Sequence, residues 1–402
     1  MFSQATPAQR RTLLAAALGW ALDAFDVMLY AMVVAYVMRD LRIDKPTVGL
    51  LNTLTLLASG IGGLLFGWIA DRVGRTRALM LSIATYSICS FASGLSTSVQ
   101  MLAACRFVLG LGMGGEWNTG ATLVAETWPT HLRAKAIAVV QSSWAWGYAA
   151  AALVAGLTLQ YSQNWRYVFF VGIAPALLLL WIQKEVPESE LWQKQQTNKA
   201  PNAKLSSEHV RNAIVLLALN FFGLFAWWGL FTWIPPYLSL PVEQGGRGFS
   251  QLGTTGLLVF LNLVGMFPGY ISFGFFADRI GRRWSFFLYL FAAACVVPIY
   301  AAARQPWQIL VMGAVVAFFG TGFFSGSGIV GSELFPTHVR ARALGLTYNG
   351  ARMLSCVAPY VIGSLSMHRG LSGAFVVCAV GFLLAAFTAL LLPETRGREL
   401  AN

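Results

Sequence analysis

Hydrophobic and polar residues alternate in long blocks along the whole chain. A membrane-spanning helix requires about 20 apolar residues in succession, and twelve runs of that kind follow one another, with polar loops between them. The pattern therefore predicts an all-α membrane protein with twelve transmembrane helices. Pro235-Pro236 should break the seventh run near its end, because proline cannot continue a helix. The predicted spans are residues 12–37, 47–69, 78–96, 100–122, 135–158, 165–183, 212–238, 251–276, 284–303, 307–331, 342–365 and 370–392.

The longest polar stretch divides these spans into two sets of six. Residues 184–211 are rich in Lys, Gln, Asn and Ser. They predict a cytoplasmic linker, with a surface helix around residues 188–196. The expected domains are therefore an N-terminal six-helix bundle at 1–183, the linker at 184–211 and a C-terminal six-helix bundle at 212–402.

The two halves repeat one another. Gly67-Trp-Ile-Ala-Asp-Arg-Val-Gly-Arg75 returns as Gly274-Phe-Phe-Ala-Asp-Arg-Ile-Gly-Arg282, 207 positions later. Glu126-Thr-Trp-Pro-Thr-His-Leu-Arg133 returns at 333–340 with the same offset, and Val186-Pro-Glu-Ser189 has a looser echo at 392–395. A shared offset predicts two pseudo-symmetric bundles.

The repeated basic turn has a physical explanation. Its glycines let two helices approach closely and the chain reverse tightly. Its aspartate can cap a helix or pair with arginine, and its arginines remain in water and headgroups. A single copy would read as an ordinary basic loop, whereas two copies favour a shared role in conformational change. The residues concerned are Gly67, Asp71, Arg72, Gly74 and Arg75, with Gly274, Asp278, Arg279, Gly281 and Arg282.

These motifs resemble the signature of the major facilitator superfamily, which carries this turn between its second and third helices and again between its eighth and ninth. The resemblance covers nearly the whole chain. It implies a secondary transporter with two six-helix bundles around a central cavity, working by alternating access.

Composition and charge agree with a membrane protein. The chain is 57% hydrophobic and 11% charged, with a mean hydropathy of +0.63, whereas soluble domains carry about 25% charge. The net charge of +12 is spread over short loops, which favours lipid headgroups over nucleic acid as the partner. The five cysteines lie in apolar runs and suggest neither disulfides nor a metal site. We expect no cofactor and a monomer.

Lysine and arginine also predict the orientation. With the N-terminus inside, nineteen basic residues fall on the inner side and seven on the outer side. Cytoplasmic loops carry this excess, so both termini are expected in the cytoplasm and the protein in a bacterial inner membrane.

The remaining two basic residues, Arg106 and Arg352, lie inside predicted spans, as do Asp23, Asp26 and Glu116. A charge at mid-bilayer costs at least about 2.5 kcal/mol and indicates function. Three carboxylates against two guanidiniums leave one negative charge, which a bound proton would neutralise. Asp23 and Asp26 share one helix face at i and i+3. An Asp26–Arg106 ion pair that only fixes helix packing is the structural alternative.

Two of these segments carry further resemblances. Leu22-Asp-Ala-Phe-Asp26 is similar to the Asp-Gly-Phe-Asp phrase in the first helix of organic-acid:proton symporters, with Ala24 in place of glycine. The run from Cys105 to Trp117 resembles the fourth-helix motif of the superfamily, in which arginine is associated with proton transfer. The excess carboxylate and these resemblances together predict that Asp23, Asp26, Arg106 and Glu116 couple protons to transport.

Arg352 is the candidate for substrate binding. The repeat offset places Ala145 at the equivalent position of the first half, so the arginine has no counterpart. Guanidinium binds carboxylate bidentately, although an arginine that snorkels or pairs with a neighbour remains an alternative. The other candidates for a cavity lining are Asn349, Tyr348, Gln141 and Trp144.

Other classes of function lack their motifs. No Gly-x-x-x-x-Gly-Lys-Ser/Thr loop for ATP occurs, and no His-Glu-x-x-His or Gly-x-Ser-x-Gly sequence of an enzyme occurs. The sequence therefore predicts proton-coupled uptake of a small organic acid anion. A sugar-type proton symporter, a proton-driven exporter of drugs or metabolites and a transporter-like sensor remain alternatives. The fifth span, without a Gly-Pro ending, argues against the exporter.

Overall fold

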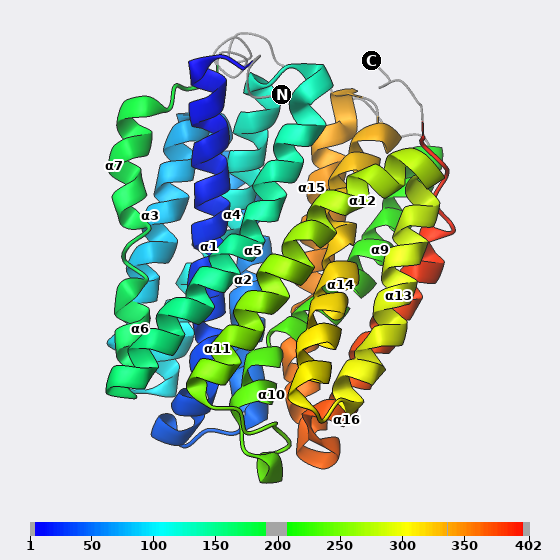
Figure 1. Ribbon diagram of the computed structural model, residues 1–402. Helices are drawn as coiled ribbons and strands as arrows, with labels where there is room; N and C mark the ends of the chain where they lie inside the picture. The colour runs from blue at the N-terminus through cyan, green and yellow to red at the C-terminus, as the bar shows by residue number, and fades with distance from the viewer. Residues whose placement is uncertain (1–4, 190–206, 336, 397–402) are drawn as a thin grey trace. The chain divides into compact units, whose positions relative to one another are not determined.

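The computed structural model describes residues 5–189, 207–335 and 337–396. These residues form helices joined by short turns (Figure 1). In chain order the elements are α1 (Pro7–Leu41), α2 (Lys45–Val73), α3 (Arg75–Gly94), α4 (Val99–Thr127), α5 (Thr130–Ser162), α6 (Trp165–Val171), α7 (Ala176–Glu185), α9 (Ser207–Phe231), α10 (Ile234–Ser239), η2 (Val242–Gln244), α11 (Gln251–Phe260), η3 (Leu261–Met266), α12 (Phe267–Ile280), α13 (Arg282–Ala302), α14 (Pro306–Leu334), α15 (Thr337–Ser355) and α16 (Ala358–Ala389).

The helices cover the twelve predicted spans. Nine stretches among the described residues are long and apolar enough to cross a bilayer. One of them, Ala343–Ala389, has 47 residues and covers the last two predicted spans, since α16 bends at Gly370, where φ is 65°. Helices α3 and α4 cover the remaining two spans. The prediction of an all-helical membrane fold is confirmed.

Three spans are interrupted rather than continuous. The seventh span breaks between Phe231 and Ile234, directly before the two prolines, as predicted. The sixth span breaks between Val171 and Ala176, and the eighth passes through the π-helical turn η3. Irregular backbone inside a bilayer is tolerated where protein buries it.

Contacts divide the chain into two compact units. Unit 1 comprises Met1–Val33 and Leu54–Pro201, and unit 2 comprises Val34–Thr53 and Asn202–Asn402. The end of α1 and the start of α2 therefore belong to unit 2, where Asn52 Nδ2 donates to Thr232 Oγ1 at 2.9 Å. The domains expected from the sequence follow chain order and stay a prediction. Most of the expected linker, with its surface helix, lies outside the described residues.

Within each unit, the helices pack in a recurring pattern. In unit 1, α3 lies against α4, α6 and α7. In unit 2, α9 lies against α15 and α16, and α13 against α14 and α16. Close contacts use small residues: a Cβ on Gly114 of α4 would lie only 1.9 Å from the carbonyl oxygen of Ser59 on α2. Small residues allow such approach of backbones in membrane helices.

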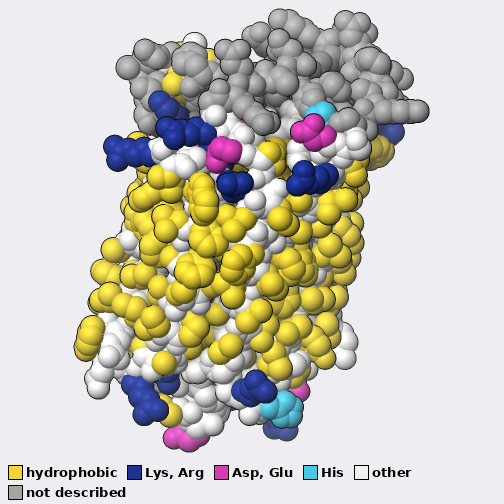
Figure 2. All heavy atoms as spheres, turned by 90° about the vertical axis from the view of Figure 1, so that its right-hand side faces the viewer, with side chains coloured by type: hydrophobic (Ala, Val, Ile, Leu, Met, Phe, Trp, Pro, Cys, Tyr) yellow, Lys and Arg dark blue, Asp and Glu magenta, His cyan; other side chains and the backbone are white. Residues whose placement is uncertain are grey.

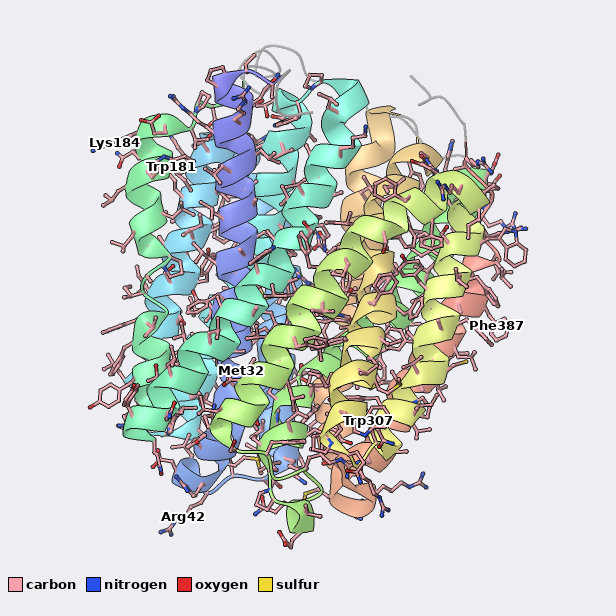
Figure 3. All side chains as sticks on the ribbon, viewed as in Figure 1. Met32, Arg42, Trp181, Lys184, Trp307 and Phe387 are labelled. Carbon is pink, nitrogen blue, oxygen red and sulfur yellow. The ribbon has the colours of Figure 1, made fainter. Side chains whose placement is uncertain are left out.

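The surface has apolar and basic zones. One face carries a broad band of hydrophobic side chains, with Lys and Arg gathered at its two ends (Figure 2). On α7, Trp181 and Lys184 lie toward the same end of the helix, the tryptophan half-buried (Figure 3). Arg11 on α1 pairs with Glu185 at 2.9 Å, so the start of α1 and the end of α7 lie at the same end of unit 1. Tryptophan beside lysine at a helix end is typical of a membrane–water boundary.

Candidate functional site

Unit 1 contains a buried acidic group on α1. Asp23 and Asp26 are 1% and 0% exposed, and the helix geometry places both on one face. They lie close enough to interact electrostatically. The two carboxylates predicted from the sequence therefore share one buried environment.

Asp26 accepts a hydrogen bond from a serine that the sequence did not predict as part of the site. Ser90 Oγ of α3 donates to Asp26 Oδ1 at 2.9 Å, and Oδ2 has no hydrogen-bond partner among the described residues. Gly172, in the break of the sixth span, lies beside this hydrogen bond. A Cβ on Gly172 would lie 2.0 Å from Ser90 Oγ and 2.7 Å from Asp26 Oδ1. Glycine is thus required where the interrupted helix meets the carboxylate.

Arg106 on α4 is fully buried but is not paired with Asp26. Its guanidinium lies over the ring of Tyr30, 4.8 Å from the centroid, a distance typical of a cation–π contact. Its three nitrogens have no hydrogen-bond partner in the described part of the chain, and no ion pair within 4.0 Å joins it to Asp26. The two groups still interact electrostatically. The alternative of a fixed packing ion pair therefore does not describe this conformation.

Glu116, also on α4, meets α1 one turn before Asp23. Its carboxylate lies against Gly19, where an added Cβ would lie 2.5 Å from Oε1. Tyr86 of α3 reaches the same residue, since its hydroxyl donates to the Gly19 carbonyl at 3.4 Å. Tyr86 also lies within electrostatic range of Glu116, Asp23 and Asp26. The three predicted carboxylates thus all interact electrostatically with one tyrosine.

Aromatic side chains cover the adjacent part of α1. Trp20 packs against Trp117 of α4 and Trp144 of α5, with ring centroids 4.6 and 4.8 Å apart. Gln141, one turn before Trp144, is buried, and its Oε1 has no hydrogen-bond partner among the described residues. Both candidates of the fifth span therefore lie in unit 1, and Trp144 packs against α1.

The candidates of unit 2 lie together on α15. Arg352 is 2% exposed and lies 5.6 Å from the ring centroid of the half-buried Tyr348. Its Nε and Nη1, and Oδ1 of the buried Asn349, have no hydrogen-bond partners in the part of the chain that is described. A buried guanidinium with two unused donors is suited to bind an anion.

The basic turns form one network in each unit. Arg75 pairs with Asp71 at 2.5 Å and with Glu126 at 3.3 Å, and Arg282 pairs with Asp278 at 2.7 Å and Glu333 at 2.9 Å. Arg72 covers the Trp68 ring at 3.9 Å, and Arg279 is exposed. The repeated acidic motif at Glu126 and Glu333 is therefore the partner of the repeated turn.

The carboxylate that caps each following helix comes from the third, looser repeat. Glu188 Oε1 accepts the backbone N–H of Arg75 at 2.8 Å, and Glu394 Oε1 accepts that of Arg282 at 2.8 Å. An anion is stabilised at a helix N-terminus by the free N–H groups and the helix dipole. Partial burial raises the pKa of Glu394, but backbone N–H groups of Arg282, Arg396, Arg283 and Thr395 outweigh it and hold the pKa below its usual range.

Only some of the motif glycines have the role expected of them. Gly74 and Gly281 have φ of 109° and 97°, a region that favours glycine, and a Cβ on Gly281 would lie 2.5 Å from Glu394 Oε2. At Gly67 and Gly274 an added Cβ would meet nothing within 4 Å. The expectation of close helix approach at these two positions is therefore wrong for this conformation, because the space beside them is open.

Comparison with known proteins decides the family. The profile of the Major Facilitator Superfamily matches residues 16–250 and 248–402. The chain belongs to the major facilitator superfamily. It is therefore a multi-pass membrane transporter rather than an enzyme, related to carriers of metabolites and organic acids.

Its relatives within the superfamily match over nearly their whole length. A probable 4-methylmuconolactone transporter of Cupriavidus pinatubonensis is 35% identical, over 100% of this chain and 94% of that protein. The sialic acid transporter NanX of Escherichia coli is 31% identical, over 97% of this chain and 94% of that protein. The crystal structure of a D-xylose-proton symporter shares the fold, with a TM-score of 0.80 at 19% identity, over 98% of this chain and all of that one.

Three polar residues of this superfamily member were not predicted from the sequence as candidates for function. Ser90 is one of several serines on α3, and Tyr86 follows an ordinary apolar pattern. Asn262 is fully buried in the π-helical η3, where Nδ2 donates to the Leu258 carbonyl at 2.8 Å and Oδ1 has no partner among the described residues. In the sequence, the available signal was a polar residue in the middle of the apolar eighth span. The π-helical turn around it is a feature that is frequent at functional sites.

Proposed function

We propose that the protein takes up a small organic acid anion together with protons, by alternating access. The observation that carries the proposal is the set of buried charges. Among the described residues inside the predicted spans of unit 1, Asp23, Asp26 and Glu116 are all buried with one guanidinium, that of Arg106. Even with Arg352 of unit 2, the carboxylates remain in excess by one. Protonation removes an uncompensated charge that is costly in a low-dielectric interior.

Proton binding at these carboxylates provides the coupling in this proposal. Asp26 accepts from Ser90 rather than pairing with Arg106, an arrangement compatible with a neutral carboxyl. Loss of the proton would leave an anion near a guanidinium with unused donors, and the two would attract each other. A change of partner for Asp26 would then link the protonation state to helix positions.

Arg352 is assigned to the substrate carboxylate, with Asn349 and Tyr348 beside it. Gln141 and Trp144 of unit 1 are further candidates for substrate binding. The relatives named for 4-methylmuconolactone and sialic acid support an oxygen-rich organic metabolite. Guanidinium favours a carboxylate over a neutral sugar because the pairing is charged and bidentate.

The remaining parts of the proposal concern the setting and the conformational cycle. The excess of basic residues in the loops on one side supports a bacterial inner membrane protein with both termini in the cytoplasm. We further propose that it acts as a monomer and that the basic turns control its conformational cycle. The domains of the cycle are 1–183 and 212–402, joined by the linker 184–211.

Transport by purified protein in proteoliposomes tests the proposal. A panel of labelled monocarboxylates is offered with and without an inside-alkaline pH gradient. We expect accumulation of at least one carboxylate only with the gradient. Preferred accumulation of a neutral sugar would favour the sugar-type symporter instead, and binding without flux would favour a sensor.

A further inference from the structure

Tyr86 interacts electrostatically with all three buried carboxylates, Glu116, Asp23 and Asp26. Its ring packs in an apolar cluster with Leu79, Ile83 and Leu109. Phenylalanine would fill this space without burying a hydroxyl, whose desolvation is unfavourable unless it is hydrogen-bonded. The hydroxyl has one acceptor, the Gly19 carbonyl, at 3.4 Å. This is long for an O–H···O hydrogen bond, so a nearby carboxylate can compete for the hydrogen.

The charged groups that act on Tyr86 come from two helices, α1 and α4. Helix α3 packs against α4, α6 and α7. The charged groups that act on Tyr86 among the described residues are Glu116 from α4 and Asp23 and Asp26 from α1, with none from α6 or α7. Arg106 acts instead on Tyr30 and Asp26. The charged groups that interact with Tyr86 in the described part of the chain are therefore all carboxylates.

Gly19 fixes the geometry on the α1 side. Glu116 Oε1 and the Tyr86 hydroxyl both approach this residue, one against its α-carbon and the other at its carbonyl. Asp23 follows one helical turn later on the same helix. The hydroxyl and the Glu116 carboxylate therefore both lie against Gly19, one helical turn before Asp23.

We propose that the Tyr86 hydroxyl relays a proton between Glu116 and Asp23, and so couples the three carboxylates into one proton-binding unit. In the relay, the Tyr86 oxygen accepts the proton of the Glu116 carboxyl while its own hydrogen passes to the Asp23 carboxylate. One O–H bond breaks and one forms at the tyrosine, which is neutral before and after. The negative charge moves from Asp23 to Glu116, and no other reactant is consumed.

This inference rests on the proposed proton coupling, and the experiment separates the two. Tyr86→Phe removes only the hydroxyl. The control is Tyr148→Phe, because Tyr148 is another fully buried tyrosine of unit 1 and lies on α5, whereas Tyr86 lies on α3. Both variants and the wild type are reconstituted. Accumulation driven by a pH gradient is compared with equilibrium exchange of the same substrate, which needs no net proton movement.

We expect Tyr86→Phe to keep exchange close to the wild-type rate and to lose roughly tenfold or more of gradient-driven accumulation. Tyr148→Phe should retain both activities. Accumulation by Tyr86→Phe equal to the wild type would overturn the relay, and so would equal losses of exchange and accumulation, which indicate a structural role. Failure of the wild type itself to respond to the gradient would instead reject proton coupling.

A second variant covers the case in which Tyr86→Phe does not fold. Replacement of Tyr86 by 3-fluorotyrosine preserves the ring and the hydroxyl but makes the hydroxyl more acidic. We expect the pH profile of accumulation to shift while that of exchange does not. An unchanged pH profile of accumulation would contradict the relay.

Discussion

Ser90 donates a hydrogen bond of 2.9 Å to Asp26, and this bond lies directly against Gly172 in the break of the sixth span. Three elements far apart in the sequence, α1, α3 and the α6–α7 break, therefore meet at one carboxylate. The backbone at the break turns through i to i−3 hydrogen bonds, from Gly172 to Phe169 and from Ala174 to Val171. Short tight turns within a helix often mark a hinge, which links the shape of the sixth span to the state of Asp26.

Gly172→Ala tests this contact. The added methyl group would displace Ser90 Oγ or Asp26 Oδ1, since the space between them and the glycine is too small. We expect strongly reduced gradient-driven accumulation in reconstituted protein. Gly256→Ala on α11 is the control, because its Cβ would meet nothing within 4 Å, and it should be neutral or stabilising by about 0.5–1 kcal/mol. Wild-type accumulation by Gly172→Ala would show that the contact has no functional role.

The helix cap at Glu394 predicts a dependence of stability on pH. The pKa of this carboxyl is depressed in the folded protein by backbone N–H groups. Its contribution to stability is therefore fully present above the ordinary glutamate pKa of about 4.3 and is lost as the pH falls through the lower folded value. Thermal unfolding in detergent should show a larger loss of Tm on acidification for the wild type than for Glu394→Gln.

Glu243→Gln provides the matched control, because Glu243 is exposed in η2. It should follow the wild-type dependence on pH. Parallel curves for the wild type and Glu394→Gln would mean that the cap adds nothing to stability.

Arg75 predicts a kinetic effect rather than a change in affinity. It joins Asp71 and Glu126, and its backbone binds Glu188. Arg75→Ala removes the side-chain pairs and should slow exchange of the carrier between its conformations more than it weakens substrate binding. Arg77→Ala, at an exposed position of the same helix, should leave both unchanged. Calorimetry and exchange kinetics distinguish the two effects, and loss of binding with unchanged kinetics would be the contrary result.

Arg352 predicts the chemical class of the substrate. Arg352→Lys keeps the charge but loses the planar pair of donors, so it should weaken binding of the best carboxylate. Arg352→Ala should remove binding, at a cost of about 2–5 kcal/mol for a desolvated charge pair. Arg369→Ala, at an exposed arginine of the same unit, serves as the control. Unchanged affinity of Arg352→Ala in calorimetry would remove Arg352 from the substrate site.

The fold was predictable because its signals are long and repeated. The apolar runs predicted twelve transmembrane helices, and the 207-residue offset related the two basic turns from the sequence alone. The same offset related Glu126 to Glu333, but their pairing with the arginines of the turns is seen only in the structure. The looser echo relates Glu188 to Glu394, but their capping role was not predictable, because it requires the chain to return to a helix start more than 100 positions away.

The charged members of the candidate site were the easiest to predict from the sequence. Buried charges stand out in an apolar sequence, so Asp23, Asp26, Arg106 and Glu116 could be identified. Ser90 could not be distinguished from Ser82, Ser87 and Ser93, because all four are buried on α3 and only the packing against α1 selects one. The sequence also could not decide whether Asp26 prefers Arg106 or Ser90, since both choices satisfy the helix periodicity.

Gradient-driven accumulation by Asp26→Asn tests the central claim of proton coupling most directly. Asparagine preserves the shape of the side chain but cannot exchange a proton, and Asp23→Asn is measured beside it. The account predicts that Asp26→Asn inserts normally, retains substrate exchange and loses accumulation under an inside-alkaline gradient, with a strong but incomplete loss for Asp23→Asn. Full accumulation by Asp26→Asn under the same gradient would contradict the account.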